Sequence, residues 1–114
     1  MLELKTVEEF ETFIKQDKVI IDFGASWCGP CERIKPVYQA HSESEEFSTI
    51  KFAKVDCDNE VMMPICSKYA TEGIPYFITF IKGNKHQDLI GANNGALKQL
   101  LTTLNDVSSS EQQE

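Results

Sequence analysis

The stretch that decides the fold is Trp27-Cys28-Gly29-Pro30-Cys31, which stands between a predicted buried strand at 18–23 and the start of a predicted helix. The first-turn amides of a helix are unpaired and carry partial positive charge, so a thiolate at Cys28 is stabilised there and its pKa is lowered. Cys31 follows about one turn later, close enough to form a small disulfide ring with Cys28 or to attack a mixed disulfide on it. The motif therefore predicts thiol–disulfide chemistry.

The two residues between the cysteines indicate the direction of that chemistry. Gly29 permits an unusual backbone angle, and Pro30 suits the first turn of a helix, where its missing N–H is not needed. Pro30 also leaves out a titratable side chain that would stabilise the thiolate further. Its presence favours a reductant over a strong oxidant.

The chain before the motif predicts a short helix followed by a strand. Thr6 and Glu9 stand at capping-box spacing, and apolar residues follow with helical periodicity to about residue 15 or 16. Residues 18–23 are then β-branched and apolar apart from Asp22, which indicates a strand covered on both faces.

The chain after the motif alternates helix and strand and closes with a hairpin and a helix. We expect the following elements: a helix from 28–31 to about 46 with a kink at Pro36, a strand at 50–55, a helix at 59–70 that Pro64 weakens, strands at 76–81 and 86–90 joined by a turn at Gly83-Asn84, and a helix with its stripe at Leu97, Leu100, Leu101 and Leu104.

The expected order is strand, helix, strand, helix, strand, helix, strand, strand, helix. Its first part implies parallel crossovers and its last part an antiparallel hairpin. This order predicts an α/β fold with a mixed central sheet of about five strands and four flanking helices.

Several separated segments resemble the thioredoxin family. They are 22–31 with the Trp-Cys-Gly-Pro-Cys block, Pro36, Lys54-Val-Asp56, Gly73-Ile74-Pro75 and Gly91, and the resemblance runs from about residue 3 to residue 105. It implies a thioredoxin fold over residues 1–107, with a short polar tail at 108–114.

The resemblance also implies a role for each residue of the site. Cys28 is the attacking nucleophile, Cys31 is the resolving thiol, and the Cys28–Cys31 bond is the redox disulfide. Asp22 is the buried aspartate that accepts the proton of Cys31, and Lys54 is its charge partner. Substrate-binding residues are implied at the rim, at a cis-proline turn and near the groove: Trp27, Gly29, Pro30, Ile74, Pro75 and Gly91.

Three features depart from the family pattern. Glu32 stands where the family more often has Lys or Arg, and its carboxylate opposes thiolate formation unless Arg33 or Lys35 offsets it. Tyr76 replaces the usual threonine after the proline, and a bulky phenol there is expected to narrow the groove or to stack on substrate. The segment at 56–69 is slightly longer than usual and contains two further cysteines.

Other interpretations of the four cysteines stay open. One alternative for Cys28 and Cys31 is that they form half of a tetrahedral zinc site. Such a site needs four ligands and the chain has no second close pair of cysteines, so we expect no metal. Cys57 and Cys66 are expected to pack as small buried hydrophobic residues, since free cysteines usually do. A regulatory disulfide or a surface thiol is the alternative for this second pair.

Size and charge limit the classes of partner. The chain has 114 residues, the size of one domain, and 11 basic against 18 acidic residues, a net charge of −7. Such a surface repels phosphate backbones and anionic lipid, which disfavours nucleic-acid and membrane partners. The first residues lack the pattern of a signal peptide, so we expect a cytoplasmic protein, with the nucleus as the alternative.

The expected function is that of a monomeric protein-disulfide reductase, an electron carrier for cell redox homeostasis. The resemblance implies that a thioredoxin reductase using NADPH re-reduces it and that its substrates are disulfide-containing proteins. The chain has no nucleotide-binding fingerprint, so we expect no bound cofactor. The alternatives are a module that docks partners through Trp27, Ile74 and Gly91 without turnover, and an oxidant or isomerase.

Overall fold

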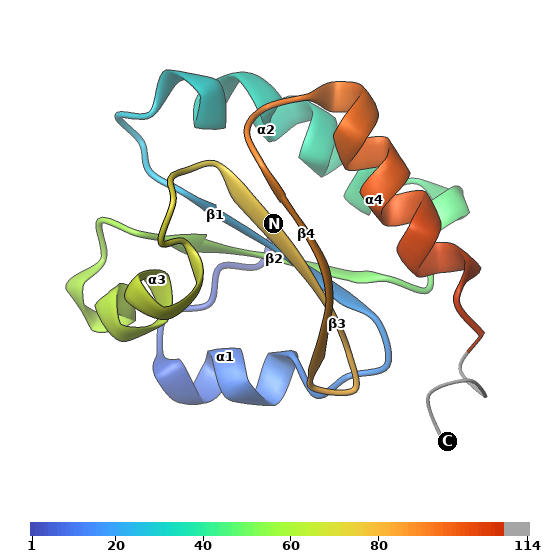
Figure 1. The fold of residues 1–114 in the computed structure, drawn as a ribbon, viewed down its shortest axis with the longest axis horizontal. Coiled ribbons are helices and arrows are strands. Elements are labelled where there is room, and N and C mark those ends of the chain that lie inside the picture. The colour runs from blue at the N-terminus through green and yellow to red at the C-terminus, as the bar shows by residue number, and fades with distance from the viewer. Residues whose placement is uncertain (109–114) are drawn as a thin grey trace.

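The apolar run after the first helix forms the central strand of a computed structural model that describes residues 1–108 (Figure 1). The elements follow in this order: α1 (Val7–Phe13), β1 (Val19–Gly24), α2 (Gly29–Ser42), the 3-10 turn η1 (Glu45–Phe47), β2 (Lys51–Asp56), the 3-10 turn η2 (Glu60–Met62), α3 (Met63–Tyr69), β3 (Tyr76–Ile81), β4 (Asn84–Ile90) and α4 (Asn94–Asp106). The predicted thioredoxin fold of α/β class is the one observed.

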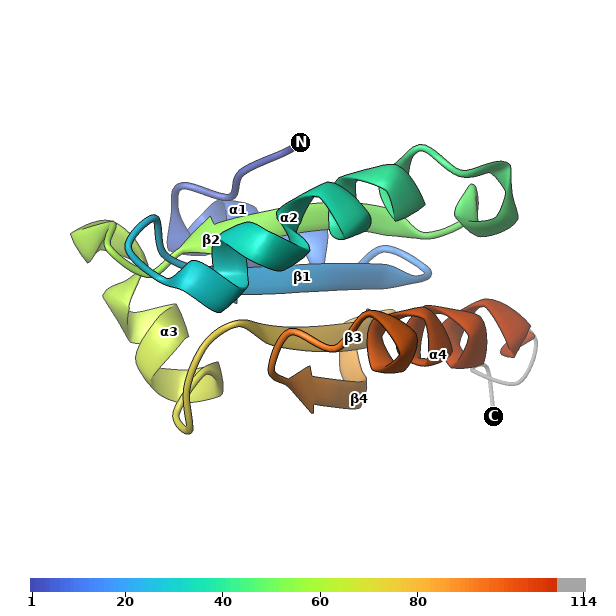
Figure 2. The same cartoon turned by 90° about the horizontal axis from the view of Figure 1, so that it is seen from above.

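The sheet is mixed, and β1 lies inside it. β1 is parallel to β2 and antiparallel to β3, while β4 pairs antiparallel with β3, so the order is β2-β1-β3-β4 (Figure 2). Four strands are present among the described residues, where about five were predicted. Residues 2–4 make only one bridge, from Glu3 to Lys54, because the chain turns away into the cap of α1 after Leu4 is buried.

Helices cover both faces of the sheet. α1 and α3 lie on one face and α2 and α4 on the other (Figure 1). β1 supplies both layers because its side chains alternate: Ile21 and Phe23 pack under α1 and α3, whereas Ile20 packs under α2 and α4. All three of these side chains have no exposed surface, which explains the continuous apolar run of this strand.

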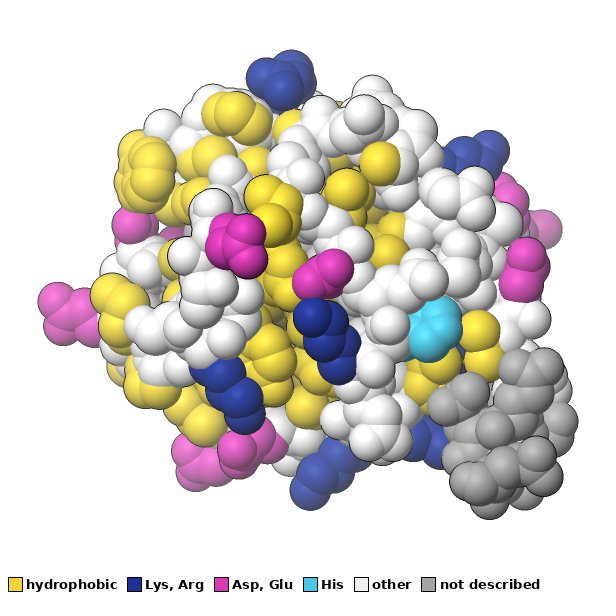
Figure 3. Space-filling view, in the orientation of Figure 1, with side chains coloured by type: hydrophobic (Ala, Val, Ile, Leu, Met, Phe, Trp, Pro, Cys, Tyr) yellow, Lys and Arg dark blue, Asp and Glu magenta, His cyan; other side chains and the backbone are white. Residues whose placement is uncertain are grey.

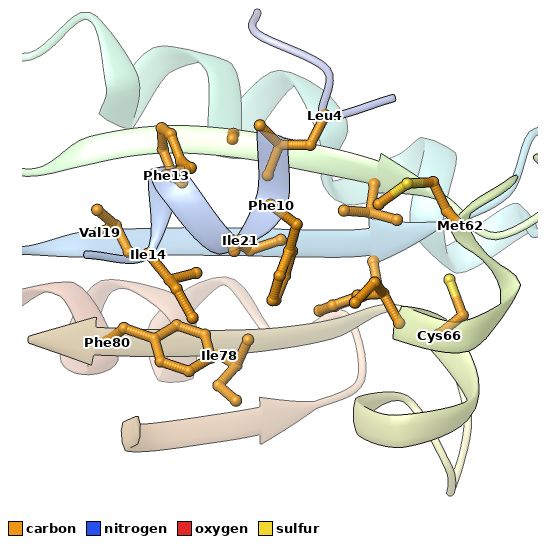
Figure 4. Close-up of a cluster of buried hydrophobic side chains, with 14 of the residues drawn as sticks. Leu4, Phe10, Phe13, Ile14, Val19, Ile21, Met62, Cys66, Ile78 and Phe80 are labelled. Atoms are coloured by element: carbon orange, nitrogen blue, oxygen red, sulfur yellow. The ribbon is translucent and has the colours of Figure 1, made fainter. Parts of the chain in front are cut away.

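Side chains from α1 and from the start of α3 close the hydrophobic layer on their face of the sheet. Phe10 of α1 reaches toward Ile21 of the sheet, Phe13 and Ile78 belong to the same cluster, and Met62 lies beside α3 (Figure 4). Thr6 caps α1 as predicted, since its Oγ1 accepts from the Glu9 N–H at 3.0 Å. The return bond differs from a capping box, because Glu9 Oε1 accepts from the Lys5 N–H at 2.7 Å and not from that of Thr6.

One local prediction was wrong, and another was right except that its helix is divided in two. The turn residues of the hairpin are Lys82 and Gly83, both with positive φ, and Asn84 already pairs with Ile81. A two-residue turn of this twist needs positive φ at both positions, so glycine takes the second one. The helix predicted at 59–70 is divided, because Pro64 stands in the first turn of α3 and a separate 3-10 turn precedes it.

Within residues 1–108, no helix is long and apolar enough to cross a membrane. The predicted boundary of the domain at residue 107 stays a prediction. Of the polar tail predicted at 108–114, residues 109–114 lie outside the part of the chain that is described here.

Tyr38 of α2 joins the helix layer to the two parallel strands. Its buried hydroxyl lies 2.7 Å from the Ala53 carbonyl of β2 and 3.1 Å from the Ile20 carbonyl of β1. We expect Tyr38→Phe to fold normally and to lower the free energy of unfolding by about 1 kcal/mol, the net value of a buried hydrogen bond. Urea denaturation measures this change.

The matched control is Tyr69→Phe. That ring also lies in the core, against Phe10, but its hydroxyl has no hydrogen-bond partner among residues 1–108. Its removal is expected to cost less than about 0.5 kcal/mol. Equal destabilisation by the two variants would show that the Tyr38 hydroxyl contributes nothing specific.

Candidate active site

The cysteine pair of the motif lies where β1 ends and α2 begins. Cys28 is the N-cap of α2: its Sγ accepts from the Cys31 N–H at 3.3 Å, and its own N–H donates to the Ala25 carbonyl at 3.1 Å. The two side chains are bonded as a disulfide, with Cα atoms 5.2 Å apart. The predicted pairing and its place at the helix start are therefore observed, and Pro30 lies in the first turn.

Trp27 forms the exposed rim beside this disulfide. Its side chain is 72% exposed, and its indole N–H donates to Asp58 Oδ1 at 2.9 Å. Asp58 is in turn placed by its own N–H, which donates to Asp56 Oδ1 at 2.9 Å. Gly29 and Pro30 are exposed next to Trp27.

Asp58 is a site residue that the sequence analysis missed. β1 and β2 are parallel and adjacent, so the loops that follow them leave the sheet at the same edge. Trp27 follows β1 and Asp58 follows β2. The polar run directly after the second strand was the signal that could have placed an acceptor near the indole.

A third loop reaches the site from the start of β3. The Ile74–Pro75 peptide bond is cis, as the resemblance implied. The Ile74 carbonyl lies 3.9 Å from Cys28 Sγ, and the Ile74 side chain packs against the small buried cluster of Ala25, Cys28 and Cys31. The Gly91 N–H donates to the Pro75 carbonyl at 2.8 Å, with Gly91 at a φ of 102° that favours glycine.

These loops gather at one end of the molecule. On the face shown in Figure 3, hydrophobic side chains recur along the left edge, over the β1–α2 loop and α3, with charged side chains between and around them. The predicted site residues are thus brought together from four separate parts of the sequence: 27–31, 56–58, 74–75 and 91.

Asp22 lies behind the disulfide in a cavity of about 120 Å³, which Cys31, Glu32, Lys35 and Lys54 also line. Its Oδ1 atom is buried and has no hydrogen-bond partner among the described residues. Burial raises the pKa of Asp22 to about 7, while Lys54, Lys35 and, with opposite sign, Glu32 act on it through their charges. Lys54 stands opposite Asp22 in the register of β1 and β2.

The charge of Glu32 is offset by Lys35, one of the two basic residues that the sequence offered for this role. Its carboxylate and the Lys35 ammonium are 3.1 Å apart on the exposed first turns of α2. Both side chains are about half exposed, so this pair adds little to stability. Its relevance is that Lys35 balances the charge of Glu32 at the mouth of the cavity.

Tyr76 does not narrow the groove, so that expectation was wrong. The first residue of β3 points to the α1 and α3 side, where its ring packs 5.9 Å from that of Phe23 and is almost fully buried. Its hydroxyl donates to Asp88 Oδ2 at 2.8 Å. Side chains alternate along a strand, and this position faces the core rather than the substrate side.

Cys57 and Cys66 do more than pack. The structure joins them in a second disulfide, with Cα atoms 5.9 Å apart, which corrects the expectation of two free buried thiols. Cys57 directly follows β2 and Cys66 lies in α3, and a spacing of nine residues could not show that the fold brings them together. No group of three His, Cys, Asp or Glu in residues 1–108 is placed to hold a metal ion.

The sequence and the fold have close counterparts among known proteins. The profile of the thioredoxin family matches residues 2–103. Human thioredoxin is 36% identical over 104 residues, which cover 90% of this chain and 95% of that protein, and Saccharomyces cerevisiae thioredoxin-1 is 35% identical over 100 residues, 87% of this chain and 93% of that protein.

Solved structures agree with these sequence relatives. The crystal structure of Malassezia sympodialis thioredoxin superposes with a TM-score of 0.85 at 30% identity, covering 91% of this chain and 92% of the other. A Plasmodium falciparum thioredoxin superposes with a TM-score of 0.82 at 36% identity, covering 90% of this chain and 98% of the other. With its cysteine pair, its fold and these relatives, the chain belongs to the thioredoxin family of thiol–disulfide oxidoreductases.

Proposed function

We propose that this protein reduces disulfides in other proteins. The observation that carries the proposal is the Cys28–Cys31 pair at the start of α2, one sulfur beside the Ile74 carbonyl at the rim and the other beside the Asp22 cavity. A dithiol in such a place can react with a partner on one side and exchange a proton on the other.

Cys28 takes the first step of this reaction. As the N-cap of α2 it receives the Cys31 N–H and the partial positive charge of the helix start, both of which stabilise a thiolate. The thiolate attacks one substrate sulfur, forms a mixed disulfide, and releases the other substrate sulfur as a thiolate.

Cys31 completes the reaction. Its thiolate attacks the Cys28 sulfur, closes the Cys28–Cys31 bond and releases the second substrate thiol, so two electrons pass to the substrate. Cys31 Sγ and Asp22 Oδ1 both lie against Gly24, where an added Cβ would be 3.4 Å from the sulfur and 3.9 Å from the oxygen. Asp22 thus lies on the side from which the thiol proton leaves.

Asp22 serves as the base for that proton. A pKa of about 7 leaves the carboxyl half-ionised near neutral pH, the condition under which it can both accept and return a proton. Lys54 keeps the pKa from rising further. Lys54 thus tunes the carboxyl of Asp22, which is the group that takes the proton.

Substrate binds as an extended segment across the rim. Tyr76 is the first residue of β3 in the sheet ladder, so the backbone of Ile74 lies beyond it and is available to pair with such a segment. Further contacts of this segment are assigned to Pro75 and Gly91, which are joined by a hydrogen bond, and to Trp27, Gly29 and Pro30, the exposed neighbours of Cys28 in the chain.

The oxidised pair is re-reduced by a thioredoxin reductase that uses NADPH, in a cytoplasmic, monomeric electron carrier without a bound cofactor that contributes to redox homeostasis. A similar solved structure, with a TM-score of 0.82 at 30% identity, comes from work on the thiol-resolving mechanism of a yeast mitochondrial 1-Cys peroxiredoxin via glutathione and thioredoxin systems. It supports disulfide-containing proteins and a dithiol reductant as the partners here.

Turnover tests the proposal directly. With NADPH, a thioredoxin reductase and insulin as the disulfide substrate, the wild-type chain is expected to drive NADPH oxidation, and Cys28→Ser is expected to reduce it to the rate without protein. If the two proteins gave equal rates, the reductase function would be wrong. Partner-dependent function that persists in Cys28→Ser/Cys31→Ser would favour the docking module instead.

Trapping tests the order of the two cysteines. Cys31→Ser retains the attacking thiol but lacks the resolving one, so it is expected to accumulate a mixed disulfide with insulin through Cys28. Non-reducing electrophoresis and mass spectrometry detect this species. Accumulation in Cys28→Ser in place of Cys31→Ser would reverse the assigned roles.

Asp22→Asn tests the base. In the wild type, closure of the Cys28–Cys31 ring from a mixed disulfide is expected to speed up as pH rises through about 7, because Asp22 accepts the proton only when ionised. The variant is expected to close the ring about tenfold more slowly at pH 7, without this midpoint. Stopped-flow fluorescence of the single tryptophan follows the step.

Stability against pH provides the control for this variant. The folded pKa of Asp22 lies above the unfolded value of 3.8, so its ionisation costs stability as pH rises from about 4 to about 7. The free energy of unfolding of Asp22→Asn, relative to that of the wild type, is therefore expected to rise by about 2 to 4 kcal/mol across that pH range. Above pH 7 the difference is expected to stay constant. A constant difference at all pH values would show that Asp22 does not titrate near neutrality.

A further inference from the structure

The second cysteine pair lies next to the rim but takes no part in the reaction above. Cys57 follows β2 and Cys66 lies in α3, with Cα atoms 5.9 Å apart. Backbone bonds hold both ends without help from sulfur: the Cys57 N–H donates to the Gly24 carbonyl, and the Cys66 carbonyl accepts from the Ala70 N–H, each at 2.9 Å. The two sulfurs therefore stay within reach of each other when the bond is open, which allows reversible closure.

The pair is asymmetric in its access to solvent. Cys66 is 6% exposed and belongs to the core under α1 and α3, whereas Cys57 is only partly buried. A small thiol or disulfide in solution therefore reaches Cys57 first. Cys66 is then positioned to react with whatever is attached to Cys57.

The loop that this disulfide closes contains the residue that holds Trp27. Residues 57–66 include Asp58, whose Oδ1 accepts the indole N–H of Trp27 at 2.9 Å. Asp58 directly follows Cys57 and is itself exposed. Closing the bridge restricts this loop, and so restricts the hydrogen bond between Asp58 and the exposed indole of Trp27.

We propose that Cys57 and Cys66 are a second redox site, which exchanges with a low-molecular-weight disulfide such as glutathione disulfide, and whose closed form holds Asp58 and Trp27 in place for docking of protein partners. The exchange is independent of the proposed function. Only the part of the proposal in which Trp27 docks protein partners rests on the proposed function.

The exchange balances with glutathione alone. The Cys57 thiolate attacks glutathione disulfide, forms a mixed disulfide and releases one glutathione thiolate. The Cys66 thiolate then attacks the Cys57 sulfur and releases the second. Two protein thiols are oxidised, one glutathione disulfide is reduced to two glutathione thiols, and the two thiol protons pass to these or to solvent.

The first experiment uses Cys28→Ser/Cys31→Ser, which leaves only the second pair to titrate. The protein is equilibrated in buffers of rising glutathione disulfide to glutathione ratio, alkylated with N-ethylmaleimide and analysed by mass spectrometry. Cys57 and Cys66 are expected to lose their free thiols together. With Cys66→Ser added, a stable glutathione adduct is expected on Cys57. Independent alkylation of the two thiols at every ratio would overturn the proposal.

The same samples report the coupling to the rim, because Trp27 is the single tryptophan. Its emission is expected to shift in step with closure of the bridge. With Asp58→Leu added, the thiols are expected to titrate as before while the emission stays constant. With Asp58→Asn, whose amide oxygen still accepts the indole N–H, the shift is expected to remain. An emission that never follows the thiols would overturn the coupling.

The second experiment measures docking. Wild type, oxidised at both pairs, and Cys57→Ser/Cys66→Ser, oxidised at Cys28–Cys31, are compared as substrates of a thioredoxin reductase. The KM of the variant is expected to be about threefold to tenfold higher at unchanged kcat, a loss comparable to one hydrogen bond. Asp58→Leu is expected to match it, and Asp58→Asn to stay near the wild type. Equal KM values for all four proteins would overturn the docking role while leaving the reductase function intact.

Discussion

The structure depends on the burial of β1 between β2 and β3. β2 pairs with this strand in parallel and β3 antiparallel, and its alternating side chains belong to the hydrophobic layers on both faces. Because β1 and β2 are parallel, their carboxyl ends meet at one edge. The cysteine motif follows the first strand and the Asp58 loop follows the second, so the rim of the site is a consequence of this pairing.

The same strand carries the one polar side chain that burial makes reactive. Asp22 lies in an otherwise apolar run and lines a cavity, and its buried Oδ1 has no hydrogen-bond donor among the described residues. Burial raises its pKa to about 7, and Lys54 limits the rise from the neighbouring strand. Ionisation of Asp22 therefore lowers the stability of the fold as pH rises from about 4 to about 7. The same burial provides a proton acceptor near Cys31.

Much of this could be predicted from local patterns. The N-cap at Thr6, the apolar run of β1, the leucine stripe of α4 and the bounds of β3 agree with the structure, since each depends on near neighbours in the sequence. The predictions were wrong where tertiary contacts decide: the hairpin turn at Lys82 and Gly83, the inward direction of the Tyr76 side chain, and the bond between Cys57 and Cys66.

The amino-acid sequence by itself determined the α/β order and the Cys28–Cys31 pair, because three-residue spacing and side-chain periodicity are local properties. The thioredoxin fold followed from the resemblance of several separated segments to that family. Only the tertiary structure decided that Asp58 holds Trp27, that Ile74 lies against Cys28, and that Cys57 is bonded to Cys66. The partners in these contacts lie 31, 46 and 9 positions apart, and their distances are set by how β2, α3 and β3 pack around β1.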